Sequence, residues 1–173
     1  MRIIAGELGG RTIKSHERAG LRPTTDRVRE SVFNMLTSRI DFDQIDVLDL
    51  FAGTGALGIE SLSRGAARCT FVESDRRTAM LIEENLRALD LADRGRVNVH
   101  DALKFIAETD QTFDLVLADP PYAATIFDQL VHDAFARSIV RENGLVLLEH
   151  SSALQPRVAA GSTILAHRTF GDT

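Results

Sequence analysis

The sequence predicts an α/β fold: a doubly wound, mostly parallel sheet with a small β-hairpin plus helix extension at the N-terminus. From Ile45 onward, short and nearly continuous apolar runs alternate with segments of helical periodicity. Strands of this kind are buried on both faces, as in parallel sheets that are covered by helices. A glycine-rich turn also joins the first of these strands to the next helix, which is typical of doubly wound folds.

Length and composition indicate one compact domain. The chain has 173 residues, of which 44% are hydrophobic and 26% charged, and this length suffices to bury a core without disulfide bonds. The single cysteine, Cys69, excludes an intrachain disulfide framework and lies in the apolar run "CTFVE", so we interpret it as a core residue. No apolar run approaches membrane-spanning length and the N-terminus shows no signal-like region. We therefore expect a cytoplasmic protein.

Charge divides the chain into two parts. Residues 1–39 hold eight basic and four acidic side chains, a net charge of +4, whereas the whole chain carries −5 and its remainder −9. A basic segment on an acidic body suggests contact with nucleic acid, although solvated arginines explain it equally well. We expect an extension over residues 1–40 and a catalytic region over residues 41–173 within one compact domain.

The N-terminal elements follow from turn and capping signals. The segment "RIIAGELGGRTIKS" predicts a β-hairpin around Gly9-Gly10. After a break at residues 20–23, "TTDRVRESVFNML" predicts a helix with Thr25 or Asp26 as its N-cap.

The remaining elements alternate between strand and helix. Strands are predicted at residues 46–52, 69–74, 96–102, 113–119 and 144–150, and helices at residues 55–65 and 76–89 and in "ALKFIAE". Residues 124–140 carry no distinctive pattern, although loops of this kind often determine substrate choice.

The glycine turn predicts a nucleotide site. Gly53, Gly55 and Gly58 stand where a strand passes into a helix, and Glu73 follows Gly53 by 20 residues at the end of the next strand. Glycines there let a ligand approach the backbone, and a carboxylate at this distance can bind ribose hydroxyls. A glycine turn that serves only packing is the alternative.

Two further carboxylates, Asp49 and Asp101, are candidate ligand contacts, and Asp49 helps to distinguish a dinucleotide from S-adenosylmethionine as the ligand. Asp49 lies inside the first strand, four residues before Gly53, where it would oppose a dinucleotide pyrophosphate but suit the sulfonium and ammonium groups of S-adenosylmethionine. Asp49 could instead cap neighbouring N–H groups. Asp101 could bind an adenine amino group or serve only as a helix N-cap. No segment resembles a hydride-transfer site, which disfavours an NAD-dependent oxidoreductase.

The stretch "LADPPY" completes a recognisable set of motifs. With "LDLFAGTGALGIE" and "FVESD", it resembles the Rossmann-type, class I methyltransferases that modify exocyclic amino groups. With "MRIIAGELGGR" and "LRPTTDRVRESVFNML" added, the chain resembles the RsmD family of 16S ribosomal RNA guanine-N2 methyltransferases from Met1 to about Gly144. The resemblance implies S-adenosylmethionine as cofactor, no metal, and 16S rRNA, within the small subunit or an assembly intermediate, as partner. It also implies one more strand after "FGDT". We further expect a monomer.

The chemistry of an amino group explains the catalytic motif. A nucleobase amino nitrogen is a poor nucleophile because its lone pair is delocalised into the ring. The Asp119 carboxylate and the Pro120 carbonyl could accept its two N–H bonds and turn the lone pair toward the methyl group. Pro120 and Pro121 would fix the backbone, and Tyr122 would stack on the flipped-out base.

The resemblance also implies the remaining site residues. The methionine end of the cofactor would lie beside Arg22, Pro23 and Thr24. Expected cofactor contacts are Thr24, Asp49, Phe51, Gly53, Gly55, Glu73, Asp101 and Ala102. Expected RNA contacts are Arg2, Arg11, Lys14, Arg22, Arg27 and Arg29, the last two being available to RNA or to the cofactor carboxylate.

Two other functions compete with this interpretation. An adenine-N6 methyltransferase acting on DNA or RNA shares the Asp-Pro-Pro-Tyr motif, although DNA-modifying enzymes generally carry an added target-recognition region. A non-enzymatic RNA-binding assembly factor could retain the same fold. The sequence identifies neither the target guanine nor whether naked RNA or an assembled subunit is the substrate.

Overall fold

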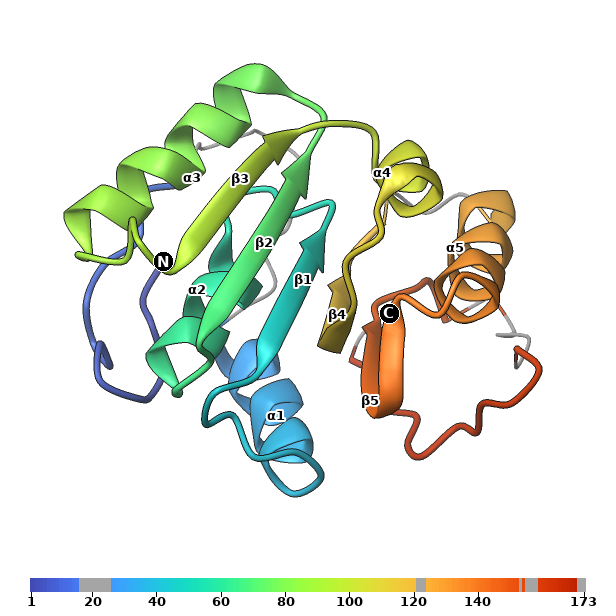
Figure 1. Ribbon diagram of the computed structural model, residues 1–173. Helices are drawn as coiled ribbons and strands as arrows, with labels where there is room; N and C mark the ends of the chain where they lie inside the picture. Colours follow the sequence, from blue (N-terminus) through green and yellow to red (C-terminus); the bar gives the residue numbers. More distant parts are fainter. Residues whose placement is uncertain (16–25, 121–123, 153, 155–158, 171–173) are drawn as a thin grey trace.

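Five parallel strands form the sheet at the centre of the molecule (Figure 1). The computed structural model describes residues 1–15, 26–120, 124–152, 154 and 159–170. The strands are β1 (Asp46–Leu50), β2 (Arg68–Glu73), β3 (Gly95–Val99), β4 (Phe113–Ala118) and β5 (Val140–Leu148), in the spatial order β3-β2-β1-β4-β5. The chain thus reverses direction of winding between β1 and β4, which is where doubly wound folds bind ligands.

Helices cover both faces of the sheet and divide the core in two (Figure 1). On one face lie α1 (Asp26–Thr37), α2 (Ala56–Ser63) and α3 (Arg76–Ala88), with Phe33, Leu62 and Ile82 among the buried side chains. On the other lie α4 (Ala102–Glu108) and α5 (Ala124–Ala136), which contribute Ile106 and Leu130. The predicted doubly wound parallel architecture is confirmed.

In the sheet and its helices, the sequence prediction differs most from the structure at α5 and β5. Helix α5 was not expected. It begins soon after the Asp-Pro-Pro-Tyr stretch, and Phe127, Leu130, Val131 and Ala134 give it a buried stripe at helical spacing. Strand β5 begins at Val140 rather than Gly144, and an irregularity in its pairing with β4 between Phe113 and Leu115 accommodates the extra residues. Neither difference changes the order of the strands.

The predicted N-terminal hairpin forms only in part: Arg2 and Thr12 make one antiparallel bridge, and backbone hydrogen bonds join Ile3 to Arg11 and Ile13 to Met1, each at 3.0 Å. The segment between them also contacts α2, because the buried Glu60 carboxylate accepts the N–H groups of Ile4 (2.7 Å) and Ala5 (3.1 Å). These bonds give polar backbone groups the partners that a second strand would otherwise supply. The extension is therefore fixed to the face of the sheet that α2 covers.

None of the helices in the described parts of the chain combines the length and apolar composition needed to cross a bilayer.

Candidate active site

The candidate site lies along the carboxyl edge of the sheet, where β2, β1, β4 and β5 end beside the glycine loop. Each of these four strands supplies one carboxylate within or directly after its last residues: Glu73, Asp49, Asp119 and Glu149. Parallel strands place their carboxyl ends at one edge, so the alternating sequence gathers these groups although they span 101 positions from Asp49 to Glu149.

The glycine loop runs from the end of β1 into α2 with a strained backbone. Phe51, Gly53 and Gly55 all have positive φ, at 56°, 55° and 77°. At Gly55, the N-cap of α2, this left-handed conformation needs a glycine, and no side chain caps the helix there. The loop therefore presents backbone N–H groups of a helix N-terminus, a suitable environment for an anionic or nucleotide group.

Glu73 fastens the loop to the end of β2. One carboxylate oxygen accepts the Gly53 N–H at 2.9 Å, and the other accepts the Asp75 N–H at 2.8 Å. The side chain is half-buried. Since a carboxylate oxygen can accept more than one hydrogen bond, Glu73 can hold the loop and still accept a ribose hydroxyl. The spacing of 20 residues thus corresponds to a direct contact.

Asp49 lies beneath the loop and is almost fully buried, with 2% exposure. Its carboxylate accepts the Gly58 N–H at 2.9 Å, so the capping alternative considered from the sequence is observed. Burial, reinforced by the charges of Asp119 and Glu73 and opposed by the Gly58 hydrogen bond, raises the pKa of Asp49 to about 8. A buried carboxyl in a negative surrounding favours a cationic ligand.

Gly58 allows α2 to approach the sheet. A Cβ atom at this position would lie 2.3 Å from Phe71 Cε1 and 2.6 Å from Cys69 Sγ, both closer than contact permits. The absence of a side chain thus lets the Gly58 N–H reach Asp49. Cys69 itself is buried, as the sequence predicted.

Asp119 directly follows β4 at the mouth of the site, and Pro120 behind it is buried. The Asp119 side chain reaches the surface, yet protein surrounds much of it. This partial desolvation, together with the charge of Glu149, raises the pKa of Asp119 to about 7. Asp119 is thus poised to accept hydrogen bonds near neutral pH.

Asp101 is the N-cap of α4, where its carboxylate accepts the Lys104 N–H at 3.0 Å. The neighbouring Ala102 is buried. The capping alternative is observed here too, and adenine contacts at these two residues stay predictions.

The basic residues expected to meet RNA have different environments. Arg2 and Arg27 are exposed. Arg11 and Lys14 are also exposed, but each is tied to α3: the Arg11 guanidinium donates to the Ala88 carbonyl at 2.7 Å, and Lys14 pairs with Glu84 at 3.4 Å.

The expectation that Arg29 is available to RNA is wrong. Its side chain is fully buried, and it donates to the Arg2 carbonyl and to Asp26 (2.9 Å), so it joins α1 to the N-terminal segment. Among the described residues, its Nε and Nη1 atoms have no hydrogen-bond partner.

Several expected site residues lie outside the described residues. These are Arg22, Pro23, Thr24, Pro121 and Tyr122. Among the residues that are described, no group of three or more His, Cys, Asp or Glu side chains is arranged to hold a metal ion.

The chain is similar to known proteins along its whole length. The family model described as Conserved hypothetical protein 95 matches residues 1–173. The chain belongs to this family. It is 38% identical to ribosomal RNA small subunit methyltransferase D of Escherichia coli, over 86% of this chain and 74% of that protein. It is 35% identical to the YlbH protein of Bacillus subtilis, over 100% of this chain and 95% of that protein.

Solved structures of relatives have the same fold. The YhhF protein of Escherichia coli superposes with a TM-score of 0.90 at 34% identity, covering 99% of this chain and 93% of that one. A Thermus protein gives a TM-score of 0.81 at 30% identity, over 99% and 95% of the two chains. The resemblance to the RsmD family and the Rossmann-like class I fold are confirmed.

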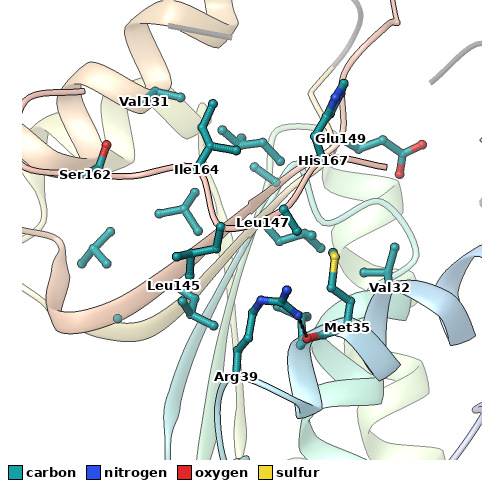
Figure 2. A pocket seen from close by; sticks show the side chains of 18 of the residues that line it. Val32, Met35, Arg39, Val131, Leu145, Leu147, Glu149, Ser162, Ile164 and His167 are labelled. Carbon is teal, nitrogen blue, oxygen red and sulfur yellow. Dashed lines mark hydrogen bonds between the residues drawn. The ribbon is translucent and has the colours of Figure 1, made fainter. Parts of the chain in front are cut away.

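In this member of the family, the structure adds one residue to the site that sequence reasoning missed. Glu149 follows β5 as Asp119 follows β4, and it lines a cavity of about 950 Å³ between α1, β5 and residues 160–170 (Figure 2). Its lining includes Leu57 of α2 and reaches Ala118 and Glu149 at the carboxyl edge, but it includes none of residues 51–55. The signal in the sequence was the similar ending of "LVLAD" and "LVLLE".

Proposed function

We propose that this protein transfers the methyl group of S-adenosylmethionine to the exocyclic N2 amino group of a specific guanine in 16S ribosomal RNA. The observation that carries this proposal is the adjacency of two sites on one sheet edge. A glycine loop fastened by Glu73 lies at β1 and β2, and Asp119-Pro120 lies at the end of β4. The similarity to ribosomal RNA small subunit methyltransferase D of Escherichia coli also supports it.

The residues present fit S-adenosylmethionine. Gly53 leaves the loop backbone open to a ligand, Gly55 lets the loop turn into α2 against the core, and Glu73 can accept ribose hydroxyls while it keeps its bonds to the loop. The buried Asp49 holds a proton near neutral pH in the ligand-free protein, and it would give up that proton beside the sulfonium and ammonium groups of the ligand to become their negative partner. Asp101 and Ala102 at the start of α4 would contact the adenine, Phe51 would line the loop, and Thr24 would contact the methionine end. When bound, the cofactor supplies an activated methyl group.

Asp119 and Pro120 act on the acceptor. The Asp119 carboxylate and the Pro120 carbonyl accept the two N–H bonds of the amino group, which favours a pyramidal nitrogen with its lone pair directed at the cofactor. The Asp119 carboxylate is also the adjacent acceptor for the proton that the nitrogen loses on methylation. Pro121 keeps the loop rigid and Tyr122 stacks on the flipped base. Positioning and electrostatics account for the rate, so these residues need no metal.

RNA contact is assigned to the extension over residues 1–40, on a catalytic region of residues 41–173. Among the described residues of the extension, Arg2 and Arg27 are exposed arginines, and we assign them to RNA together with Arg22, which lies outside the described residues. Arg11 and Lys14 would exchange their contacts with α3 for phosphate. The basic surface of residues 1–40 is small, which suits a ribonucleoprotein that already presents its target. The substrate is therefore the small subunit or an assembly intermediate in the cytoplasm. The protein acts on it as a monomer.

Methyl transfer to unmodified small subunits tests the proposal. Purified protein and labelled S-adenosylmethionine are incubated with such subunits and, separately, with protein-free 16S rRNA, and the RNA is digested to nucleosides. We expect label in N2-methylguanosine, mainly from subunits. Label in N6-methyladenosine would transfer the assignment to the adenine-specific class, and absence of label with bound cofactor would favour a non-enzymatic assembly role.

A further inference from the structure

Glu149 and Asp119 occupy equivalent positions on neighbouring strands. Ala118 of β4 is in register with Leu148 of β5, and Asp119 and Glu149 follow them. The Glu149 N–H donates to the Ala118 carbonyl at 2.9 Å, so the pairing of the two strands continues up to this point. Adjacent strands lie about 4.8 Å apart. The backbones that carry the two carboxylates are therefore near neighbours.

Both side chains belong to the same face of the sheet. Leu115 and Leu117 of β4, with Leu145 and Leu147 of β5, pack in the core under α1, α2 and α3. Since side chains alternate along a strand, Asp119 and Glu149 continue these two rows at the carboxyl edge. Figure 2 shows Leu145, Leu147 and Glu149 following one another along the cavity, with Glu149 at the end away from Arg39.

The strand order places Asp119 between the glycine loop and Glu149 along the carboxyl edge of the sheet. The glycine loop and Glu73 belong to β1 and β2, whereas Glu149 belongs to β5, and β4 with Asp119 lies between them. The lone pair of an amino nitrogen is directed out of the plane of the ring, so a base whose amino group is held at Asp119 with this lone pair toward the glycine loop can extend along the carboxyl edge from β4 to β5. Among the described residues, the acidic side chain that follows β5 there is Glu149, which is half-buried and whose charge acts on Asp119.

We propose that Glu149 selects guanine by accepting the N1–H of the target base while Asp119 accepts a hydrogen bond from its N2 amino group. In guanine these two donors are adjacent on the Watson–Crick edge, so they match two neighbouring carboxylates. Adenine has an acceptor at N1, which would face the Glu149 carboxylate with lone pair against lone pair. This inference rests on the function proposed above and adds to it the residue that determines base specificity.

The test uses 2-aminopurine, which keeps the 2-amino group but has no hydrogen at N1. Once the target position is mapped, small subunits are assembled from ligated 16S rRNA that carries guanosine or 2-aminopurine riboside there. Sites that hydrogen-bond a substrate N–H strongly reject analogues that lack it. For the unaltered protein we expect kcat/KM to be at least about 100-fold lower on 2-aminopurine.

The Glu149→Gln variant should change this ratio. An amide can donate to the N1 acceptor of 2-aminopurine, so transfer to guanosine should fall and the preference should shrink to below about 10-fold. Glu149→Asp retains a carboxylate and should keep the preference at a lower kcat/KM. Glu142→Gln, an exposed residue on the same strand, is the matched control and should leave both substrates unchanged. Calorimetry with S-adenosylhomocysteine checks that each variant still binds cofactor.

The outcomes separate the two proposals. Equal transfer to both bases by the unaltered protein, or an unchanged ratio in Glu149→Gln whatever the absolute rates, overturns the role of Glu149. If the unaltered protein makes no N2-methylguanosine even from guanosine subunits, the proposed function itself fails. The comparison of bases on the unaltered protein holds even if Glu149→Gln does not fold.

Discussion

Replacing Asp49 with asparagine should stabilise the ligand-free protein, and more so as the pH rises. In the unfolded chain this carboxyl titrates near its ordinary pKa of 3.8, whereas burial raises the pKa to about 8 in the folded protein. Between these values the folded state holds a proton that the unfolded state has released. The stability that this proton confers is complete below about pH 4 and is lost as the pH rises toward 8, at about 1.4 kcal/mol per pH unit.

From about pH 5 to about pH 8, the Asp49 carboxyl alone should therefore lower the free energy of unfolding by up to about 4 kcal/mol. Asp49→Asn should remove this contribution, since the amide oxygen can still accept the Gly58 N–H. Denaturant unfolding followed by circular dichroism at several pH values measures the slope for both proteins. Asp119, with a pKa of about 7, adds a slope of the same sign that the variant retains.

The control is Asp43→Asn, an exposed carboxylate three residues before β1. It removes the same formal charge and should leave the pH dependence as it is in the unaltered protein. Parallel slopes for the unaltered protein and Asp49→Asn would refute the reasoning. If Asp49 also serves the cofactor, Asp49→Asn should bind S-adenosylmethionine more weakly while being more stable, whereas unchanged affinity would reduce Asp49 to a cap of α2.

Two further changes test the glycine loop. Glu73→Ala removes the acceptor of the Gly53 and Asp75 N–H groups and should weaken S-adenosylhomocysteine binding by 10-fold or more, about 1.4 kcal/mol; an unaltered dissociation constant in calorimetry would contradict the ribose assignment. Gly58→Ala places a Cβ against Phe71 and Cys69 and should cost about 1–3 kcal/mol of stability. An unchanged denaturation midpoint would show that α2 and β2 can separate without cost.

The sequence was informative where function depends on local pattern. Apolar strands alternating with helices predicted the parallel sheet. The interval from Gly53 to Glu73 predicted a ribose-binding carboxylate, and the structure places Glu73 at the glycine loop, where it accepts the Gly53 N–H. It was less informative where a residue's environment depends on a distant partner. Arg29 is buried because it reaches the carbonyl of Arg2, 27 positions away, and nothing in a helix sequence distinguishes such an arginine from a solvated one.

The same limit applies to Glu149. Its place beside Asp119 follows from the register of β4 with β5, including the irregularity near Phe113, and register is set by packing rather than by composition. Helix α5 has a recognisable apolar stripe, yet its start so close to Pro120 and Pro121 made a loop the natural expectation.

The most direct test of the account separates cofactor binding from transfer at Asp119. Single-turnover methyl transfer to small subunits and calorimetry with S-adenosylhomocysteine are measured on Asp119→Ala, with Asp110→Ala, an exposed residue before the start of β4, as control. We predict that Asp119→Ala lowers the transfer rate by at least about 100-fold, the scale of losing a key electrostatic contact. Its dissociation constant for the cofactor product should stay within about threefold of that of the unaltered protein. Transfer at the unaltered rate would remove Asp119 from the chemistry and contradict the central claim.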